Sequence, residues 1–258
     1  RIVQMPRSED YFSMRGSAQL DNVACVFRRS IFLQYQFRGD FSEDLDMGMR
    51  LIKDGYKLAL IASRHVSHSH NHTLIQTLKR NVMGLSAIYR IFPMVEPVNG
   101  PKNKLLSEII NGYRQVTDLC GKIPETAHRS GSYEQLRIPV LNHILNLPDV
   151  CGGHEQTPPS SGDLFFDEFI RELFGMYRET GRANMRVKLA DFWEHSFYPF
   201  IEAERLDLTD NNIREITNCF YQHYAALAGE LLASYCFLNP PSDPLCGIAR
   251  RLGANRGF

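Results

Sequence analysis

Two clusters of side chains before residue 73 are suited to catalysis or metal binding. The first is acidic and lies in the stretch GDFSEDLDMGMR, where it comprises Asp40, Glu43, Asp44 and Asp46. A carboxylate held where a strand meets a helix can face a cleft and take a proton from a hydroxyl as a general base. A second interpretation stays open, because acidic residues at a helix N-terminus are also favoured by the helix dipole and can serve as caps alone.

The second cluster is the stretch HVSHSHNH, which contains His65, His68, His70 and His72. In an extended segment the last three would share one face, because strand side chains alternate with a period of two. Neutral imidazole is the commonest metal ligand among side chains, so the stretch is a candidate metal site. A surface loop that holds no metal explains the same histidines equally well.

The order of residues along the chain says more than either cluster alone. Phe41 precedes Glu43–Asp44, Arg50 follows on an apolar helix, Gly55–Tyr56 opens a strand-type run, and a V-x-H ending closes at His68. This arrangement resembles the acceptor-side, C-terminal part of the catalytic domain of family 2 glycosyltransferases, the inverting enzymes of the GT-A fold.

A further stretch extends the resemblance toward the N-terminus. The segment DNVACVFRRSIF at residues 21–32 is similar to the stretch that precedes the acceptor loop in the family. The resemblance therefore covers about residues 10–90. It implies a hexosyltransferase-like enzyme that transfers a sugar from a nucleotide-sugar to an acceptor hydroxyl with inversion.

The resemblance implies a role for each matching residue. Asp44 matches the catalytic base, which takes the proton from the acceptor hydroxyl, and Glu43 would orient the acceptor or tune Asp44. His68 matches the histidine that helps to hold a divalent metal, Mg or Mn, which would neutralise the leaving diphosphate. His70 would be an alternative metal ligand or would support the ligating histidine from outside the coordination shell. Arg80 would reach the diphosphate. Arg50 is expected to pair with a carboxylate on its own helix.

The donor-binding part of the family pattern is missing from this chain. No D-x-D motif on a strand end precedes residue 40, and the chain begins at Arg1 rather than Met. We therefore expect a fragment that lacks the nucleotide-binding half, with an incomplete metal site and no activity by itself. Micromolar binding of a UDP-sugar or dTDP-sugar in calorimetry would contradict this expectation.

An α/β region is needed to position these residues, and the pattern of residues 1–92 predicts one. Strand-type runs occur at 21–28 and 56–62. A helix is expected over 42–53, because Leu45, Met49 and Ile52 share one face, with Ser42 as N-cap and Gly55 as the stop. A long helix is expected from Thr73 to about Phe92, followed by a Pro-rich linker at 93–102.

The remainder, 103–258, is predicted to be helical, with apolar faces that form a core. The predicted fold class is therefore α/β but mostly helical: a truncated GT-A-like piece followed by a helical region. Helices are expected near 105–116, 133–147, 165–174, 187–204 and 212–238, and a Gly- and Pro-rich loop near 148–163.

Composition limits the partners and the compartment. Lys plus Arg and Asp plus Glu are 29 each among 258 residues, so a nucleic acid is not an expected partner. The six cysteines form no C-x-x-C pair, which is typical of free thiols in a reducing compartment, so a cytoplasmic location is expected. No apolar run is long enough for a transmembrane helix. The donor sugar, the acceptor and the oligomeric state are not specified.

Two other functions remain open at this point. A metal-dependent hydrolase would use the histidine cluster with Asp44 or Asp46. A non-enzymatic helical interaction domain would use residues 103–258 as its main body, and a large exposed apolar patch on its helices would favour it.

Overall fold

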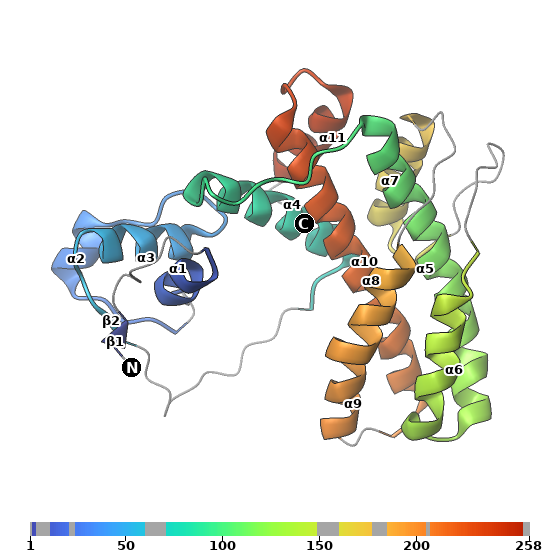
Figure 1. Ribbon diagram of the computed structural model, residues 1–258. Helices are drawn as coiled ribbons and strands as arrows, with labels where there is room; N and C mark the ends of the chain where they lie inside the picture. The colour runs from blue at the N-terminus through green and yellow to red at the C-terminus, as the bar shows by residue number, and fades with distance from the viewer. Residues whose placement is uncertain are drawn as a thin grey trace. The chain divides into compact units, whose positions relative to one another are not determined.

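The chain forms two compact units, which the computed structural model describes over residues 2–3, 11–20, 24–59, 71–148, 160–176, 185–204 and 207–254. Unit 1 comprises Arg1–Asn71 and Met83–Pro97, and unit 2 comprises His72–Val82 and Val98–Phe258. Helix α4 (Leu74–Ile91) belongs to both, because its first half packs in unit 2 and its second half in unit 1 (Figure 1). The chain passes back into unit 2 at Val98, inside the expected linker.

Unit 1 is built mainly from helices. They are α1 (Tyr11–Ala18), α2 (Arg29–Gln34), α3 (Glu43–Lys53) and the second half of α4. Its described strands, β1 (Ile2–Val3) and β2 (Leu58–Ala59), pair antiparallel, with Ile2 opposite Ala59.

The predicted GT-A-like α/β fold is therefore wrong. In the described part of the expected strand at 21–28, residues 24–28 form no strand, and only Leu58–Ala59 of the expected strand at 56–62 is described as extended and paired. A short apolar run is compatible with a strand or with other structure, and it becomes a strand only when a neighbour supplies the hydrogen bonds. Here the only described neighbour of β2 is β1, and the ladder stops after two residue pairs.

Helix α3 is the centre of unit 1 because it is buried on two faces. Leu45, Met49 and Ile52 pack with residues of α1 and α4, as their spacing predicts. Met47 and Leu51 pack on the other side against Tyr35. Gly48 allows the close approach of α1, since a Cβ atom there would lie 1.9 Å from the carbonyl oxygen of Ala18.

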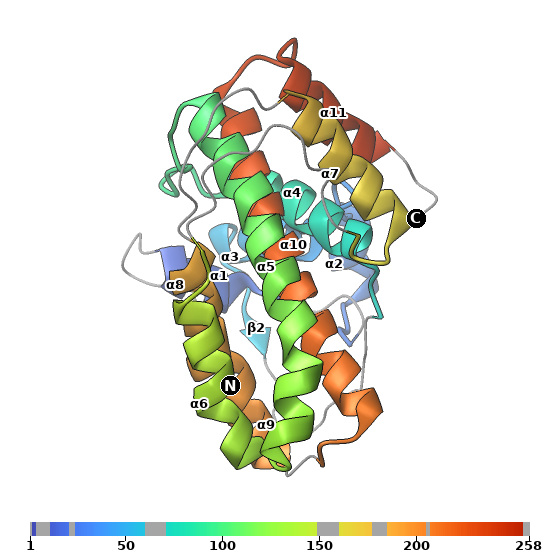
Figure 2. The same ribbon diagram turned by 90° about the vertical axis from the view of Figure 1, so that its right-hand side faces the viewer.

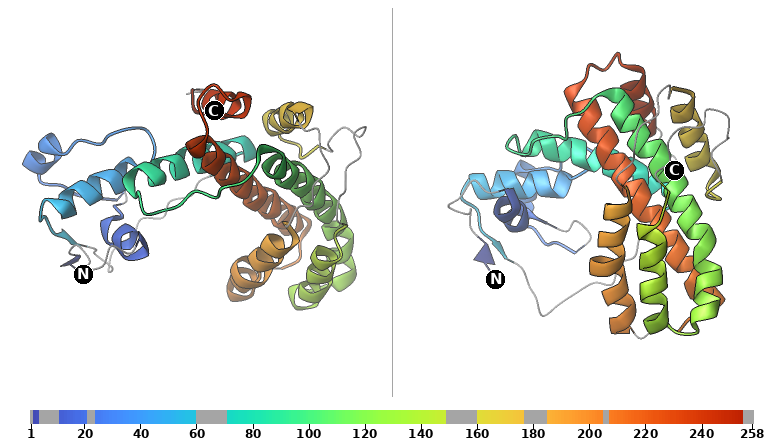
Figure 3. Two further views of the ribbon diagram at one scale, coloured as in Figure 1. Left: turned by 45° about the horizontal axis from the view of Figure 1, so that its top comes forward. Right: turned by 45° about the vertical axis from the view of Figure 1, so that its right-hand side comes forward.

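Unit 2 is helical throughout its described residues. Its long helices α5 (Lys102–Ser130) and α10 (Asp210–Leu238) lie side by side and run antiparallel (Figure 2). Helix α6 (Tyr133–Leu145) packs on α5, and α9 (Tyr198–Glu204) packs on α6 (Figure 3). The other helical elements are α7 (Leu164–Met176), α8 (Met185–Asp191), the π-helical turn η1 (Phe192–Phe197) and α11 (Pro244–Ala254).

Local signals set the helix ends of unit 2. Thr73 and Gln76 form a capping box at the start of α4, because each side chain accepts the other's backbone N–H. Gly131 ends α5 in the left-handed conformation. The predicted helix over 187–204 widens into η1 just before Pro199, whose ring nitrogen has no hydrogen to donate to the preceding turn.

The core of unit 2 is aromatic and contains one satisfied carboxylate. Trp193 is fully buried and donates its indole N–H to the carbonyl oxygen of Arg137 at 3.1 Å. Asp167 accepts the Tyr113 hydroxyl at 2.8 Å and the Ser160 hydroxyl at 2.6 Å, and it also accepts the backbone N–H of Ser161. Burial alone would raise the pKa of Asp167, but these hydrogen bonds hold it below its ordinary value.

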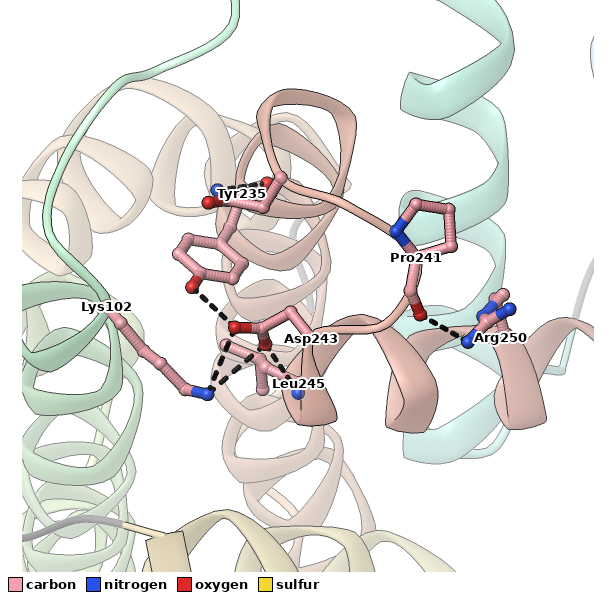
Figure 4. A network of polar contacts seen from close by, with 7 residues as sticks. Lys102, Tyr235, Pro241, Asp243, Leu245 and Arg250 are labelled. Atoms are coloured by element: carbon pink, nitrogen blue, oxygen red, sulfur yellow. Dashed lines mark hydrogen bonds and ion pairs between the residues drawn. The ribbon is translucent and has the colours of Figure 1, made fainter.

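A second carboxylate, Asp243, joins three elements of unit 2 (Figure 4). Its side chain accepts the backbone N–H of Leu245 at 2.8 Å, which caps α11, and the hydroxyl of Tyr235 at 3.2 Å from α10. Lys102 at the start of α5 lies 3.2 Å away. Burial would raise the pKa of Asp243, but the Leu245 N–H and the Lys102 ammonium lower it overall. Asp243 therefore ties α5, α10 and α11 together.

Within the described ranges, no helix combines the length and the apolar composition that a bilayer span requires. The apolar stretch at 224–238 is part of α10, where Tyr224, Ala228 and Leu232 are fully buried. It is a core helix, as predicted.

Candidate functional site

The candidate site lies at the start of α3, where the chain makes a strained turn. Ser42 precedes the helix with φ 53° and ψ 26°, and it is the one non-glycine residue with positive φ among those that the structure describes. The left-handed conformation costs a residue with a Cβ atom roughly 1–2 kcal/mol. Ser42 occupies the predicted N-cap position, but its side chain makes no capping hydrogen bond. Strain of this kind concentrates at functional sites.

Glu43 and Asp44 occupy the first turn of α3, and both side chains are half-buried. One carboxylate oxygen of Asp44, Oδ1, accepts the backbone N–H of Leu45 at 2.7 Å. This bond fixes the orientation of the carboxylate. The structure therefore holds a carboxylate at the helix start, where the sequence predicts a base.

Asp46 and Arg50 form an ion pair one turn further along α3, with 2.8 Å between Oδ2 and Nε. The guanidinium of Arg50 also donates to the carbonyl oxygen of Gln36 at 2.7 Å. The prediction that Arg50 pairs on its own helix is confirmed. Through Gln36 the same side chain ties the segment after α2 to α3.

The other end of α3 borders a groove of about 260 Å³. Three cationic side chains line it, together with Asp54, Gln34 and Tyr35; the cations are those of Arg38, Arg50 and Lys53. The Tyr35 hydroxyl donates to Asp54, and this hydrogen bond is the main reason that the pKa of Tyr35 is raised to about 12. Three cations and one carboxylate line the groove, so its lining has an excess of positive charge, although Arg50 is also paired with Asp46.

A tight turn brings Asp54 and Lys53 to this groove. Gly55 ends α3 with φ 83°, and the N–H groups of Gly55 and Tyr56 bond back to Ile52 and Leu51 at 3.0 and 2.9 Å. This pair of bonds is the Schellman arrangement, which favours glycine at the left-handed position. The prediction that Gly55 stops the helix is confirmed.

The remaining predicted site residues are not brought to α3 by any described contact. Arg80 lies on the first half of α4, which belongs to unit 2, and its side chain is exposed. His68 and His70 lie outside the described residues. Across the described ranges, no group of three or more His, Cys, Asp or Glu side chains is arranged to hold a metal ion. The roles of Arg80, His68 and His70 stay predictions.

The groove at the end of α3 was not predicted from the sequence. Its residues come from α2, from the segment after it and from the last turn of α3, and they meet because Tyr35 packs on Met47 and Leu51. A clue does exist in the sequence, since no acidic residue occurs between residues 24 and 39 while three arginines do. Such a local charge bias points to a basic surface.

The family resemblance depends on the order of a few residues, from Phe41 through Glu43–Asp44 and Arg50 to His68. In the described structure, Glu43 and Asp44 lie on a helix as the resemblance implies, but the sheet has two short strands and is not the expected α/β sheet. Wider comparison adds no relative: the chain matches no protein-family model, no curated protein and no solved structure.

Proposed function

We propose that unit 1 carries the acceptor side of a sugar-transfer reaction, in which an acceptor hydroxyl attacks a nucleotide-sugar with inversion. The observation that carries this function is the position of Asp44. It is a half-buried carboxylate in the first turn of α3, anchored by the Leu45 N–H and preceded by the strained Ser42. The resemblance to family 2 glycosyltransferases supports the same residue.

Asp44 has the chemistry that the reaction needs. A sugar hydroxyl is a poor nucleophile until its proton is removed, and a positioned carboxylate removes it as the oxygen attacks the anomeric carbon. The nucleoside diphosphate then leaves with the electrons of the glycosidic bond. A fixed Oδ1 keeps the carboxylate in one orientation during this transfer. Glu43, its neighbour in the same turn, orients the acceptor.

The donor side of the reaction is not assigned to the described residues. A divalent metal at His68 and His70, and contact between Arg80 and a diphosphate, stay part of the proposal as the resemblance implies them. A metal would supply charge neutralisation at the leaving diphosphate. We assign no step to it.

We infer a cytoplasmic location for this activity. Its support is the spacing of the cysteines. Among the described residues, Cys120, Cys219, Cys236 and Cys246 are also free thiols. Free thiols are typical of a reducing compartment.

The test is a substitution at Asp44 in the full-length protein. Release of nucleoside diphosphate from a panel of UDP-, GDP- and dTDP-sugars, with and without hydroxyl acceptors, first identifies the donor. Asp44→Asn should then lower turnover by about 10²–10⁴-fold while donor binding is retained, because only proton removal is lost. Circular dichroism should show an unchanged helical content.

Asp40→Asn is the matched control, since it removes an acidic charge from an exposed position just before α3. Its turnover should stay close to that of the unsubstituted protein. Turnover of Asp44→Asn within tenfold of the unsubstituted protein would remove Asp44 from the role of base. Failure of every donor in the panel to release nucleoside diphosphate would count against sugar transfer itself.

A further inference from the structure

Helix α2 is apolar and only partly covered: Ile31 packs on the cluster around Tyr35, but the side chains beside it are exposed. The six residues Arg29–Gln34 include Ile31, Phe32 and Leu33, but none of the six is buried. Leu33 is 60% exposed and Phe32 is 39% exposed, and Val26 just before the helix is 98% exposed. Helices at the surface normally turn such side chains toward a core, so this face is suited to a partner.

The exposed face has a fixed shape. The rings of Phe27, Phe32 and Phe37 contact one another, with centroid distances of 5.9, 6.2 and 5.8 Å. Phe27 and Phe37 also pack on the buried cluster around Tyr35. The apolar face is therefore held in place by unit 1 and does not depend on α2 alone.

Three exposed arginines lie close in the sequence to these apolar side chains. Arg28, Arg29 and Arg38 are exposed, and residues 24–39 contain no acidic residue. The groove beside α2 adds Lys53 and the partly exposed Arg50, which is paired with Asp46, and it also contains the carboxylate of Asp54. Its volume of about 260 Å³ corresponds to roughly nine water molecules, which is room for a phosphate group.

We propose that the α2 surface, comprising Val26–Arg38 with Arg50 and Lys53, binds the surface of a membrane that contains anionic phospholipids. The exposed Val26, Phe32 and Leu33 would enter the boundary between headgroups and acyl chains. The neighbouring arginines would lie at headgroup level, with a lipid phosphate in the groove. Apolar side chains accompanied by cations are the pattern of interfacial membrane binding.

This occupant fits the surface better than a nucleic acid or a soluble anion does. Either of those would use the cations but would leave the large apolar side chains of α2 in water. A lipid surface uses both, because it buries apolar area and neutralises cationic charge together. The inference does not depend on the role of Asp44.

The test is co-sedimentation of the full chain with phosphatidylcholine vesicles that contain or lack phosphatidylserine. We expect binding to the phosphatidylserine vesicles, much weaker binding without that lipid, and a decrease as salt is raised. The variant Phe32→Ser/Leu33→Ser should lower the partition by at least about tenfold, because each large apolar side chain that enters the bilayer contributes roughly that factor. Arg28→Glu/Arg29→Glu should lower it by about tenfold or more.

The matched control is Phe237→Ser/Leu238→Ser at the end of α10, where the two side chains are 47% and 45% exposed. Its partition should equal that of the unsubstituted chain, and circular dichroism should show that every variant is folded. Equal binding to both kinds of vesicle, absence of binding, or an equal loss in the control would overturn the inference. If a short oligonucleotide displaces the chain from the vesicles at a concentration below that of the accessible lipid, the surface would be assigned to nucleic acid instead.

Discussion

Removal of the Asp243 side chain should loosen the junction of α5, α10 and α11. In Asp243→Ala the Leu245 N–H loses its cap, the Tyr235 hydroxyl loses its acceptor, and the Lys102 ammonium loses its partner (Figure 4). We expect the free energy of unfolding of unit 2 to fall by about 2–3 kcal/mol.

The magnitude follows from the three contacts. Loss of a helix N-cap costs about 1 kcal/mol, and loss of a hydroxyl hydrogen bond to a carboxylate costs about 1 kcal/mol or slightly more. The ion pair contributes no more than about 0.5 kcal/mol, because the side chains of Lys102 and Asp243 are 30% and 19% exposed and solvent screens them. Asp243→Asn keeps an oxygen for the cap and should therefore cost only about 1 kcal/mol.

The measurement is urea unfolding followed by circular dichroism at neutral pH. For a unit of this size, Asp243→Ala should also lower the melting temperature by about 5–10 °C. The control is Asp118→Ala, which breaks an exposed pair with Lys122 on α5 and should cost less than about 0.5 kcal/mol. The reasoning fails if Asp243→Ala is no more destabilising than this control, or if Asp243→Asn costs as much as the alanine variant.

Two further outcomes follow from unit 2. In the folded protein, Asp167 and Asp243 have pKa values below their ordinary values, so each stabilises the fold fully above about pH 4 and loses this contribution as pH falls through its folded pKa. Melting temperatures measured toward acid pH should show this loss. A plot of melting temperature against pH as flat as that of the double asparagine variant would contradict it. Gly229→Ala should cost about 1–3 kcal/mol in urea unfolding, because its Cβ would lie 2.8 Å from the Leu78 carbonyl oxygen. Gly121→Ala, which meets no atom within 4 Å, should be neutral or slightly stabilising, and equal effects of the two alanines would refute the packing.

The parts of the fold that depend on nearby residues were predictable from the sequence. Helix α3 begins after Ser42 and ends before Gly55 as predicted, because its apolar spacing and the Gly55 turn are local signals; Ser42 stands at the N-cap position but makes no capping bond. Helix α4 follows Thr73 for the same reason, and α10 follows its apolar face. Helix α5 also follows its apolar face, but it extends to Ser130, well past the expected end near residue 116.

The sheet was not predictable, because strand formation depends on distant partners. Residues 24–28 and 56–62 have apolar runs that a strand would accept, and an extended pairing needs a neighbour of comparable length. In the described residues that neighbour is Ile2–Val3, and the pairing covers two residues on each side. The expectation of an α/β domain came from the family resemblance, which the local pattern could not test.

The candidate site divides in the same way. Glu43 and Asp44 were predictable, because an acidic pair beside a helix start is a local pattern. The groove with Tyr35, Arg38 and Lys53 was not, because α2 and the end of α3 meet only when Tyr35 packs on the α3 helix. The exposure of the α2 side chains likewise depends on which distant segments pack against them, and a short stretch of sequence does not determine this.

We expect the two proposed sites of unit 1 to act independently, because they lie at different positions along α3. Arg50 and Lys53 follow Asp44 by six and nine residues, which at 1.5 Å per residue is about 9 Å and about 13.5 Å along the helix. Two substitutions that are this far apart and share no contact partner are expected to have additive effects. Loss of vesicle binding in Phe32→Ser/Leu33→Ser should therefore leave soluble-acceptor turnover unchanged, and Asp44→Asn should leave vesicle binding unchanged, so failure of either function would not weaken the other.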